Sequence, residues 1–166
     1  MNNINKNIKK NVHFLVLVLG IVFFITFTFL KANIRTISVT EQSVLNRVNT
    51  FRRNSNLGEL KINKLLATAA KNKAIDMKMS NYFSHSSPNN IKWNDFIINK
   101  GYHYIIAGEN LARGYFTPDE LIKDWLNSEK HKENIIYPEF TETGIAIVES
   151  ETMGVIIVQL FAKPIE

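Results

Sequence analysis

The stretch from Phe14 to Leu30 is an unbroken apolar run with no charged side chain and only two threonines. With Val12 and His13 it approaches the roughly 20 residues that cross a bilayer, and it exceeds the core of about 7 to 15 residues typical of a signal peptide. Its cleavage context is poor, because bulky Leu30 lies two positions before the small residue Ala32. We therefore expect residues 12–30 to be an uncleaved transmembrane signal-anchor, with a cleaved signal peptide as the alternative.

Charges around this run predict its orientation. Residues 1–11 contain three lysines, and few charges follow the run directly, which favours a cytoplasmic N-terminus and an external domain. The predicted organisation is a basic cytoplasmic segment at 1–11, the membrane segment at 12–30, a linker at 31–40 and one domain at 41–166. The expected location is the cell membrane, single-pass, with the domain extracytoplasmic. Secretion after cleavage is the alternative.

Composition narrows the classes of function. The chain has 166 residues and no cysteine, so disulfide frameworks and thiolate chemistry are excluded, and the domain is large enough to bury a core without them. The net charge is +5, but four of the 20 basic residues lie at or before Lys31 and no acidic residue does. The remainder is therefore nearly neutral and lacks the basic face that nucleic acid requires. We expect no nucleic-acid partner.

Apolar periodicity predicts the helices and the closing hairpin. Ser38 and Glu41 have the spacing of a capping box before a helix whose apolar positions are Val44, Leu45, Val48 and Phe51. A second helix is expected from about Asn63, with an apolar stripe of Leu66, Ala70, Ala74 and Met77, and a short one from Lys92 to Lys100. Thr117-Pro118-Asp119-Glu120 is a helix start. Two strands, Gly144–Val148 and Val155–Phe161, are expected to form a hairpin. The pattern allows helices on both sides of a small antiparallel sheet.

Glu109 is placed between two histidines in distinctive settings. It lies in Gly108-Glu109-Asn110-Leu111-Ala112, after Phe83-Ser84-His85 and before Trp125-x-x-Ser128-x-x-His131. Two imidazoles and a carboxylate are the usual zinc ligands where thiolates are absent. The sequence therefore predicts a shared site of His85, Glu109 and His131 that binds a divalent metal, with Zn²⁺ as the expected ion.

The same motifs resemble the CAP superfamily, the cysteine-rich secretory protein, antigen 5 and pathogenesis-related 1 group, in a cysteine-free bacterial form. The resemblance covers about Leu45 to Phe161. Beyond the segments above, it rests on Asn49, Arg52, Leu60, Ala69, Gly101-Tyr102, Asn134-Ile135, Thr143-Gly144-Ile145-Ala146 and Gln159-x-Phe161-Ala162. It implies an α+β fold, a three-layer α/β/α sandwich with a small antiparallel sheet.

The resemblance also implies a cleft lined by two histidines and two glutamates. Three of these carry over as His85, Glu109 and His131, while the position of the second glutamate holds Ser128. Glu129 is adjacent, but one residue along a helix turns a side chain by about 100°. We therefore expect Ser128 in the cleft and Glu129 outside it.

Structural roles are the alternative for each residue. Glu109 would hold its loop by binding backbone N–H groups, His85 would cap a turn beside Ser84, and His131 would be a solvated residue at a charged helix end. Trp125 is expected in the core and His103 on the surface. A catalytic Ser128–His131 dyad at spacing i, i+3 fits one helical face, but no oxyanion hole accompanies it.

The function that these observations favour is a membrane-tethered, monomeric ectodomain that acts as a binding module, with a cleft for a metal and for a lipid or other small ligand. The alternative is a metal-dependent hydrolase of peptide or cell-envelope material with Glu109 as general base. A structural domain that only presents its surface is the third hypothesis. No catalytic residue is assigned under the first hypothesis.

Overall fold

The computed structural model describes residue 13, residues 15–19 and residues 36–165. Most of the segment predicted to cross the membrane, residues 12–30, lies outside the described residues, as do residues 1–11 and residues 31–35 of the linker. Within the described part, no helix is both long and apolar enough to cross a membrane. Contacts within the chain separate Met1–Thr36 from Ile37–Glu166, and the sheet and its surrounding helices belong to the second unit.

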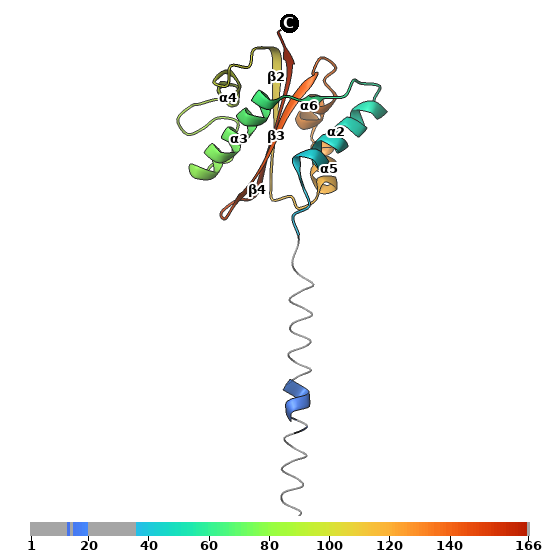
Figure 1. The fold of residues 1–166 in the computed structure, drawn as a ribbon, viewed down its shortest axis with the longest axis vertical. Coiled ribbons are helices and arrows are strands. Elements are labelled where there is room, and N and C mark those ends of the chain that lie inside the picture. The colour runs from blue at the N-terminus through green and yellow to red at the C-terminus, as the bar shows by residue number, and fades with distance from the viewer. Residues whose placement is uncertain (1–12, 14, 20–35, 166) are drawn as a thin grey trace, which may run out of the picture. The chain divides into compact units, whose positions relative to one another are not determined.

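Helices and strands alternate irregularly along this unit (Figure 1). In chain order they are α2 (Glu41–Asn54), β1 (Lys61–Ile62), α3 (Lys64–Met79), α4 (Trp93–Ile98), β2 (Tyr104–Arg113), α5 (Pro118–Asn127), α6 (Glu129–Ile136), β3 (Glu142–Ser150) and β4 (Gly154–Pro164). The expected closing hairpin is present, with both strands longer than the apolar pattern indicated.

The four strands form one sheet in the order β1-β3-β4-β2. The pairs β3–β4 and β4–β2 are antiparallel, whereas β1 runs parallel to β3 through the pairs Lys61↔Glu142 and Ile62↔Thr143. The sheet is therefore mixed, and the expectation of a wholly antiparallel sheet is wrong for this pair. A two-residue exposed strand has no apolar alternation from which its pairing could be inferred.

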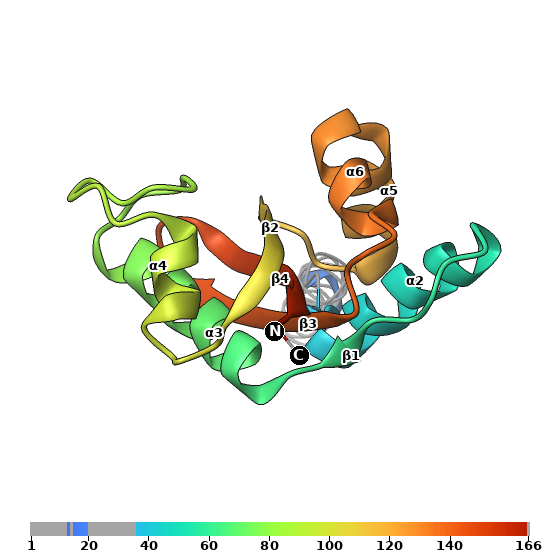
Figure 2. The same ribbon diagram turned by 90° about the horizontal axis from the view of Figure 1, so that it is seen from above.

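Helices cover both faces of the sheet, which gives the expected three layers (Figure 2). Helices α2, α5 and α6 pack on one face, where Ile157 and Phe161 of β4 contribute to the core. Helices α3 and α4 pack on the other, against Ile156, Val158 and Leu160. The faces alternate along β4 because successive side chains of a strand point in opposite directions.

Local cap chemistry explains where the helices begin. Helices α3 and α5 begin where the sequence indicated: the Asn63 side chain caps α3 by accepting from the amides of Leu65 and Leu66, and Thr117 caps α5 by accepting from that of Glu120. For α2 the predicted capping box at Ser38 is wrong. The cap is Thr40, whose hydroxyl accepts from the amide of Ser43, so the box is shifted by two residues.

The continuous helix expected from Trp125 to His131 is interrupted at Ser128. Its backbone is extended, with φ of −93° and ψ of 118°, so that Ser128 ends α5 and begins α6. The argument that one helical step separates Ser128 from Glu129 by about 100° therefore does not apply, and neither does a Ser128–His131 pair on one uninterrupted helical face. Serine suits this position because its short polar side chain favours helix ends.

Candidate functional site

Strand β2 carries Glu109 and Asn110 to opposite faces of the sheet. The amide of Gly114 donates to the carbonyl of Val155 at 2.8 Å, which extends the β2–β4 pairing. This bond shows that the even-numbered residues of β2 point their backbone groups toward β4. The side chains of Leu111 and Ala112 belong to the two different core clusters, so odd-numbered side chains here face α3 and even-numbered ones face α5 and α6. Glu109 is thus in a buried strand and not in the loop that its structural interpretation assumed.

Glu109 is joined to His85 on the α3 face. The distance from His85 Nδ1 to Glu109 Oε1 is 2.6 Å, and the side chain of Glu109 is 1% exposed whereas that of His85 is 57% exposed. An ionised carboxylate only accepts, so Nδ1 donates the proton in this contact, and in the neutral imidazole Nε2 then keeps its lone pair. The contact therefore connects a buried anion to a solvent-accessible imidazole.

The second carboxylate oxygen, Glu109 Oε2, is buried and has no hydrogen-bond partner among the described residues. Burial raises the pKa of the Glu109 carboxyl, while the hydrogen bond to His85, the charge of His85 and the charge of Lys73 lower it. A buried polar atom without a partner is costly in a folded protein. Its persistence beside an exposed histidine is typical of a functional site.

A buried lysine lies beneath this pair. Lys73 is fully buried on α3, and its ammonium donates to the Tyr82 hydroxyl at 2.9 Å. Tyr82 in turn donates to Asp76 Oδ2 at 2.5 Å. Burial lowers the pKa of Lys73, whereas the charges of Glu109 and Asp76 raise it. Lys73 thus places a positive charge near Glu109 without an ion pair between them.

His131 enters from α6, on the other face of the sheet. Asn110 Nδ2 donates to the His131 carbonyl at 3.0 Å, and Asn134 Nδ2 donates both to Asn110 Oδ1 at 2.8 Å and to the Glu109 carbonyl at 3.1 Å. Burial and the charge of His85 lower the pKa of His131. The asparagines therefore fix the helix that carries His131 to the strand that carries Glu109.

A cavity of about 320 Å³ opens beside His131. Ser128 contributes to its wall together with His131, and Glu129 is exposed. Trp125 is 2% exposed, and its indole Nε1 donates to the Leu111 carbonyl at 3.3 Å. The remaining lining residues are Phe83, Leu111, Ala112, Arg113, Tyr115 and Asp124. The lining is mostly apolar with a few polar groups, as in small-ligand sites.

Comparison with known proteins decides the family. The model of the cysteine-rich secretory protein family, CAP, matches residues 45–161, which is most of the chain. The chain belongs to the CAP family. It is 41% identical to the uncharacterised protein YkwD of Bacillus subtilis over 115 residues, which are 69% of this chain and 45% of YkwD. It is 29% identical to the uncharacterised membrane protein YlbC of the same organism, over 66% of this chain and 32% of YlbC.

The CAP fold is also found in a solved structure, an extracellular protein of Bacillus anthracis that contains an SCP domain. The likeness has a TM-score of 0.67 at 30% identity and covers 74% of this chain and 39% of that one. The chain thus spans less than half of the length of each of these three relatives. What they share with it is the CAP domain.

Within this CAP domain the predicted site residues are brought together in two pairs. His85 and Glu109 are in direct contact, and Ser128 and His131 share a cavity. His85 affects the pKa of His131, which links the pairs electrostatically. In the described part of the chain, however, no three His, Asp or Glu side chains are grouped closely enough to hold a metal ion. His103 is exposed, as expected.

Two site residues of the CAP domain were not assigned from the sequence. Lys73 has a recognisable signal, because it falls at helical spacing between Ala70 and Met77, on the buried stripe of α3, where a lysine is unusual. Asn134 is part of the family motif, but nothing in the local pattern indicates that its amide bridges Glu109 and Asn110. That role depends on the packing of α6 against β2.

Proposed function

We propose that this CAP domain is an extracytoplasmic binding module whose cleft takes a divalent metal on His85 and His131, with Glu109 orienting His85. The observation that carries the proposal is the 2.6 Å contact between His85 Nδ1 and Glu109 Oε1. A carboxylate on one ring nitrogen fixes the tautomer and increases the basicity of the other, an arrangement common around metal-ligating histidines. This assigns Glu109 to orientation instead of direct ligation.

The donor set suits a weak and exchangeable site. Two imidazoles fit Zn²⁺ and similar ions, but with two protein ligands the other coordination positions stay open to water. A cation held there would supply Lewis acidity to whatever ligand enters the cleft. The cavity beside His131 provides mostly apolar surface for that ligand, which favours a lipid or another small molecule with an apolar part.

Calorimetric titration of Zn²⁺ into the purified protein tests the metal proposal. His85→Ala and His131→Ala each remove one of the two protein ligands and should weaken binding by more than the roughly 10- to 100-fold typical of losing an outer-shell partner, and the double variant should abolish it. Affinity should fall below about pH 6, because protonation of the imidazoles competes with the metal. His103→Ala is the matched control, since His103 is exposed and outside the site. Unchanged affinity in both single variants would contradict the proposal.

We also propose that the domain is a monomer tethered by residues 12–30. The uncharged run supports the tether, and the relative YlbC is described as a membrane protein. Intact-mass measurement of protein extracted from membranes checks the tether. A mature N-terminus near Asn33 would show cleavage and secretion instead.

A hydrolase with Glu109 as general base is the second candidate, favoured by the raised pKa of Glu109 and the unpartnered Oε2. Glu109→Gln separates the two functions. A hydrolase should lose turnover of cell-envelope or peptide substrates, whereas a binding module should retain its lipid or other small ligand and bind Zn²⁺ more weakly.

A further inference from the structure

Strand β3 has a long edge that no other strand covers. On its outer side β3 pairs only with β1, and that pairing ends at Ile62↔Thr143. From Gly144 to Ser150 the described part of the chain contributes no further strand to this edge. An uncovered strand presents a row of backbone donors and acceptors that can pair with another chain.

Two hydrogen bonds determine which groups of β3 face outward. The amide of Asn63 donates to the Thr143 carbonyl at 2.9 Å, so the backbone groups of Thr143 point toward β1. On the other side of the sheet, Gly114 bonds to Val155. The backbone N–H and C=O groups of the odd-numbered residues of β4 therefore point toward β2, and those of its even-numbered residues point toward β3. Backbone groups alternate along a strand, and Ile145 and Ile147 therefore direct their N–H and C=O groups away from the sheet.

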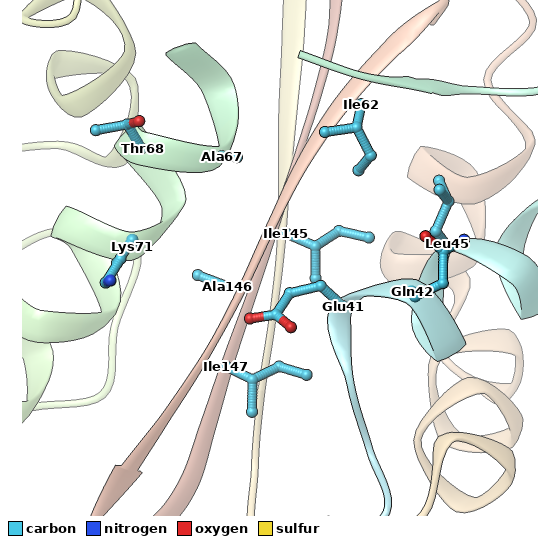
Figure 3. A pocket seen from close by; sticks show the side chains of 10 residues that line it. All are labelled: Glu41, Gln42, Leu45, Ile62, Ala67, Thr68, Lys71, Ile145, Ala146 and Ile147. Carbon is cyan, nitrogen blue, oxygen red and sulfur yellow. The ribbon is translucent and has the colours of Figure 1, made fainter. Parts of the chain in front are cut away.

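This edge forms the floor of a cavity of about 570 Å³ between α2 and α3 (Figure 3). The floor consists of Ile145, Ala146 and Ile147, and Ile62 closes the end where β1 pairs. One wall is from α2 and the other from α3: Glu41, Gln42 and Leu45, and Ala67, Thr68 and Lys71. At Gly144 an added Cβ would lie 2.1 Å from the Leu66 carbonyl carbon, so the α3 wall packs directly on β3.

We propose that this groove binds an extended peptide segment of another protein, which adds to the sheet as a strand antiparallel to β3. Only an extended backbone repeats its donors and acceptors at the two-residue spacing of Ile145 and Ile147. The antiparallel direction gives the more stable pairing per residue. This interaction is separate from the metal cleft, which lies beside β2, the strand at the opposite edge of the sheet.

The charged residues on the two walls of the groove indicate which side chains the peptide should carry. Glu41 is exposed on the α2 wall with its carboxylate toward β3, and Lys71 is exposed on the α3 wall (Figure 3). Neighbouring residues of an added strand point to opposite faces of the sheet, and thus to opposite walls. A basic residue facing Glu41 and an adjacent acidic residue facing Lys71 would complement both charges. Their apolar neighbours would pack on Leu45, Ile145 and Ile147.

The same charges disfavour a second copy of this chain as the occupant. Antiparallel pairing of two β3 strands places the two copies about a two-fold axis perpendicular to the sheet, so that equal helix layers meet. Glu41 would then approach its own counterpart, and Lys71 would approach its own. Like charges facing each other oppose such pairing.

Binding of a defined peptide to the full-length chain tests the added strand. The probe is fluorescein-labelled acetyl-Thr-Val-Lys-Glu-Val-Thr-amide, measured by anisotropy, together with two versions that are N-methylated at alternate sets of residues. Because only one set of amides faces β3, one methylated version should bind like the parent and the other at least about tenfold more weakly. Amide exchange of Ile145 and Ile147 should slow on binding, whereas that of Ala146 and Val148, which face β4, should not change. Equal binding by both methylated versions, or no binding by the parent, would overturn the proposal.

Exchange of the wall charges tests the specificity. In the double variant Glu41→Lys, Lys71→Glu, the parent peptide should bind more weakly, and a peptide with its Lys and Glu interchanged should regain affinity. The matched control is Glu129→Lys, Lys132→Glu, an exposed pair on α6 that should leave peptide binding unchanged. Zn²⁺ titration should be unaffected by the groove variants, so failure here would not affect the cleft proposal. Failure of the interchanged peptide to recover binding would exclude Glu41 and Lys71 as specificity determinants.

Discussion

The two strands with open edges, β2 and β3, satisfy those edges in different ways. On β2 the outward carbonyls of Glu109 and Leu111 accept hydrogen bonds from the side chains of Asn134 and Trp125. On β3 the outward groups of Ile145 and Ile147 receive no such bond from the described residues. An edge that the chain caps with its own side chains can hold a rigid site, whereas an edge left uncapped remains available to a partner.

The edges also differ in where their charges lie. Beside β2 a carboxylate is buried, with one oxygen on His85 and the other unpartnered. Beside β3 the charges of Glu41 and Lys71 are exposed on the helices that flank the strand. Burial strengthens interactions between charges but makes an unpaired one costly, while exposed charges contribute little to stability. Substitutions of the buried groups beside β2 should therefore affect folding, whereas substitutions of the exposed Glu41 and Lys71 at the β3 groove should not.

Replacing the asparagine cap should have the largest effect. Asn134→Asp keeps the shape of the side chain but substitutes an acceptor for the amide that donates to the Glu109 carbonyl and to Asn110 Oδ1. We expect a loss of about 3 kcal/mol in the free energy of unfolding, because two acceptors lose their donor beside a new negative charge. Urea unfolding at neutral pH measures it. Asn89→Asp in an exposed loop is the control, and equal losses in the two variants would show that Asn134 is not a structural cap.

The tryptophan cap should matter less. Trp125→Phe removes the indole N–H that bonds to the Leu111 carbonyl and leaves part of a core position empty. The two effects together should lower the free energy of unfolding by about 1–2 kcal/mol. Trp93→Phe serves as the comparison, since Trp93 is half-buried at the start of α4. If Trp125→Phe lowers the free energy of unfolding no more than Trp93→Phe does, the Trp125 side chain does not stabilise the β2 edge.

The smallest effect should be a change in the pH dependence of stability. Burial raises the pKa of Glu109 in the folded state, so the folded protein holds this proton at pH values where the unfolded chain has lost it. Its contribution to stability is therefore greatest below the ordinary pKa of a glutamate and falls as pH rises above it. Glu109→Gln removes this dependence.

Thermal melts between about pH 4 and 7 in the presence of a chelator measure this effect. The Tm of Glu109→Gln relative to the wild type should increase as pH rises, and Glu129→Gln at an exposed position is the control. A Tm difference for Glu109→Gln that shrinks with rising pH would mean that His85 and Lys73 outweigh burial at this carboxyl.

Features set by neighbouring residues were predictable from the sequence. The starts of α3 and α5 follow from Asn63 and Thr117, and the buried stripe of Leu66, Ala70, Ala74 and Met77 follows from helical periodicity. The three-layer fold came from the family resemblance, and the family model and the structure confirm it.

Features set by long-range pairing were not predictable in the same way. The parallel β1–β3 pair, the role of Asn134 and the burial of Lys73 against Tyr82 all join segments that no local pattern relates. The break at Ser128 was missed because helical periodicity continues on both sides of it. His85 and Glu109, two of the predicted site residues, are in contact, whereas their role and the three-ligand metal site stay predictions.

The irregularity at the start of β2 determines where this chain can tolerate a change of length. The register against β4 shifts between Tyr104 and Ile106, next to the exposed Ile105. An inserted or deleted residue there can be absorbed by the existing bulge and leave the later pairs in place. Within Gly108-Glu109-Asn110 the same change would move each following side chain to the other face and exchange the carboxylate with the amide. Sequences that diverge by insertion are therefore expected to vary in length before Ile106 and to keep constant spacing from Gly108 to Ala112.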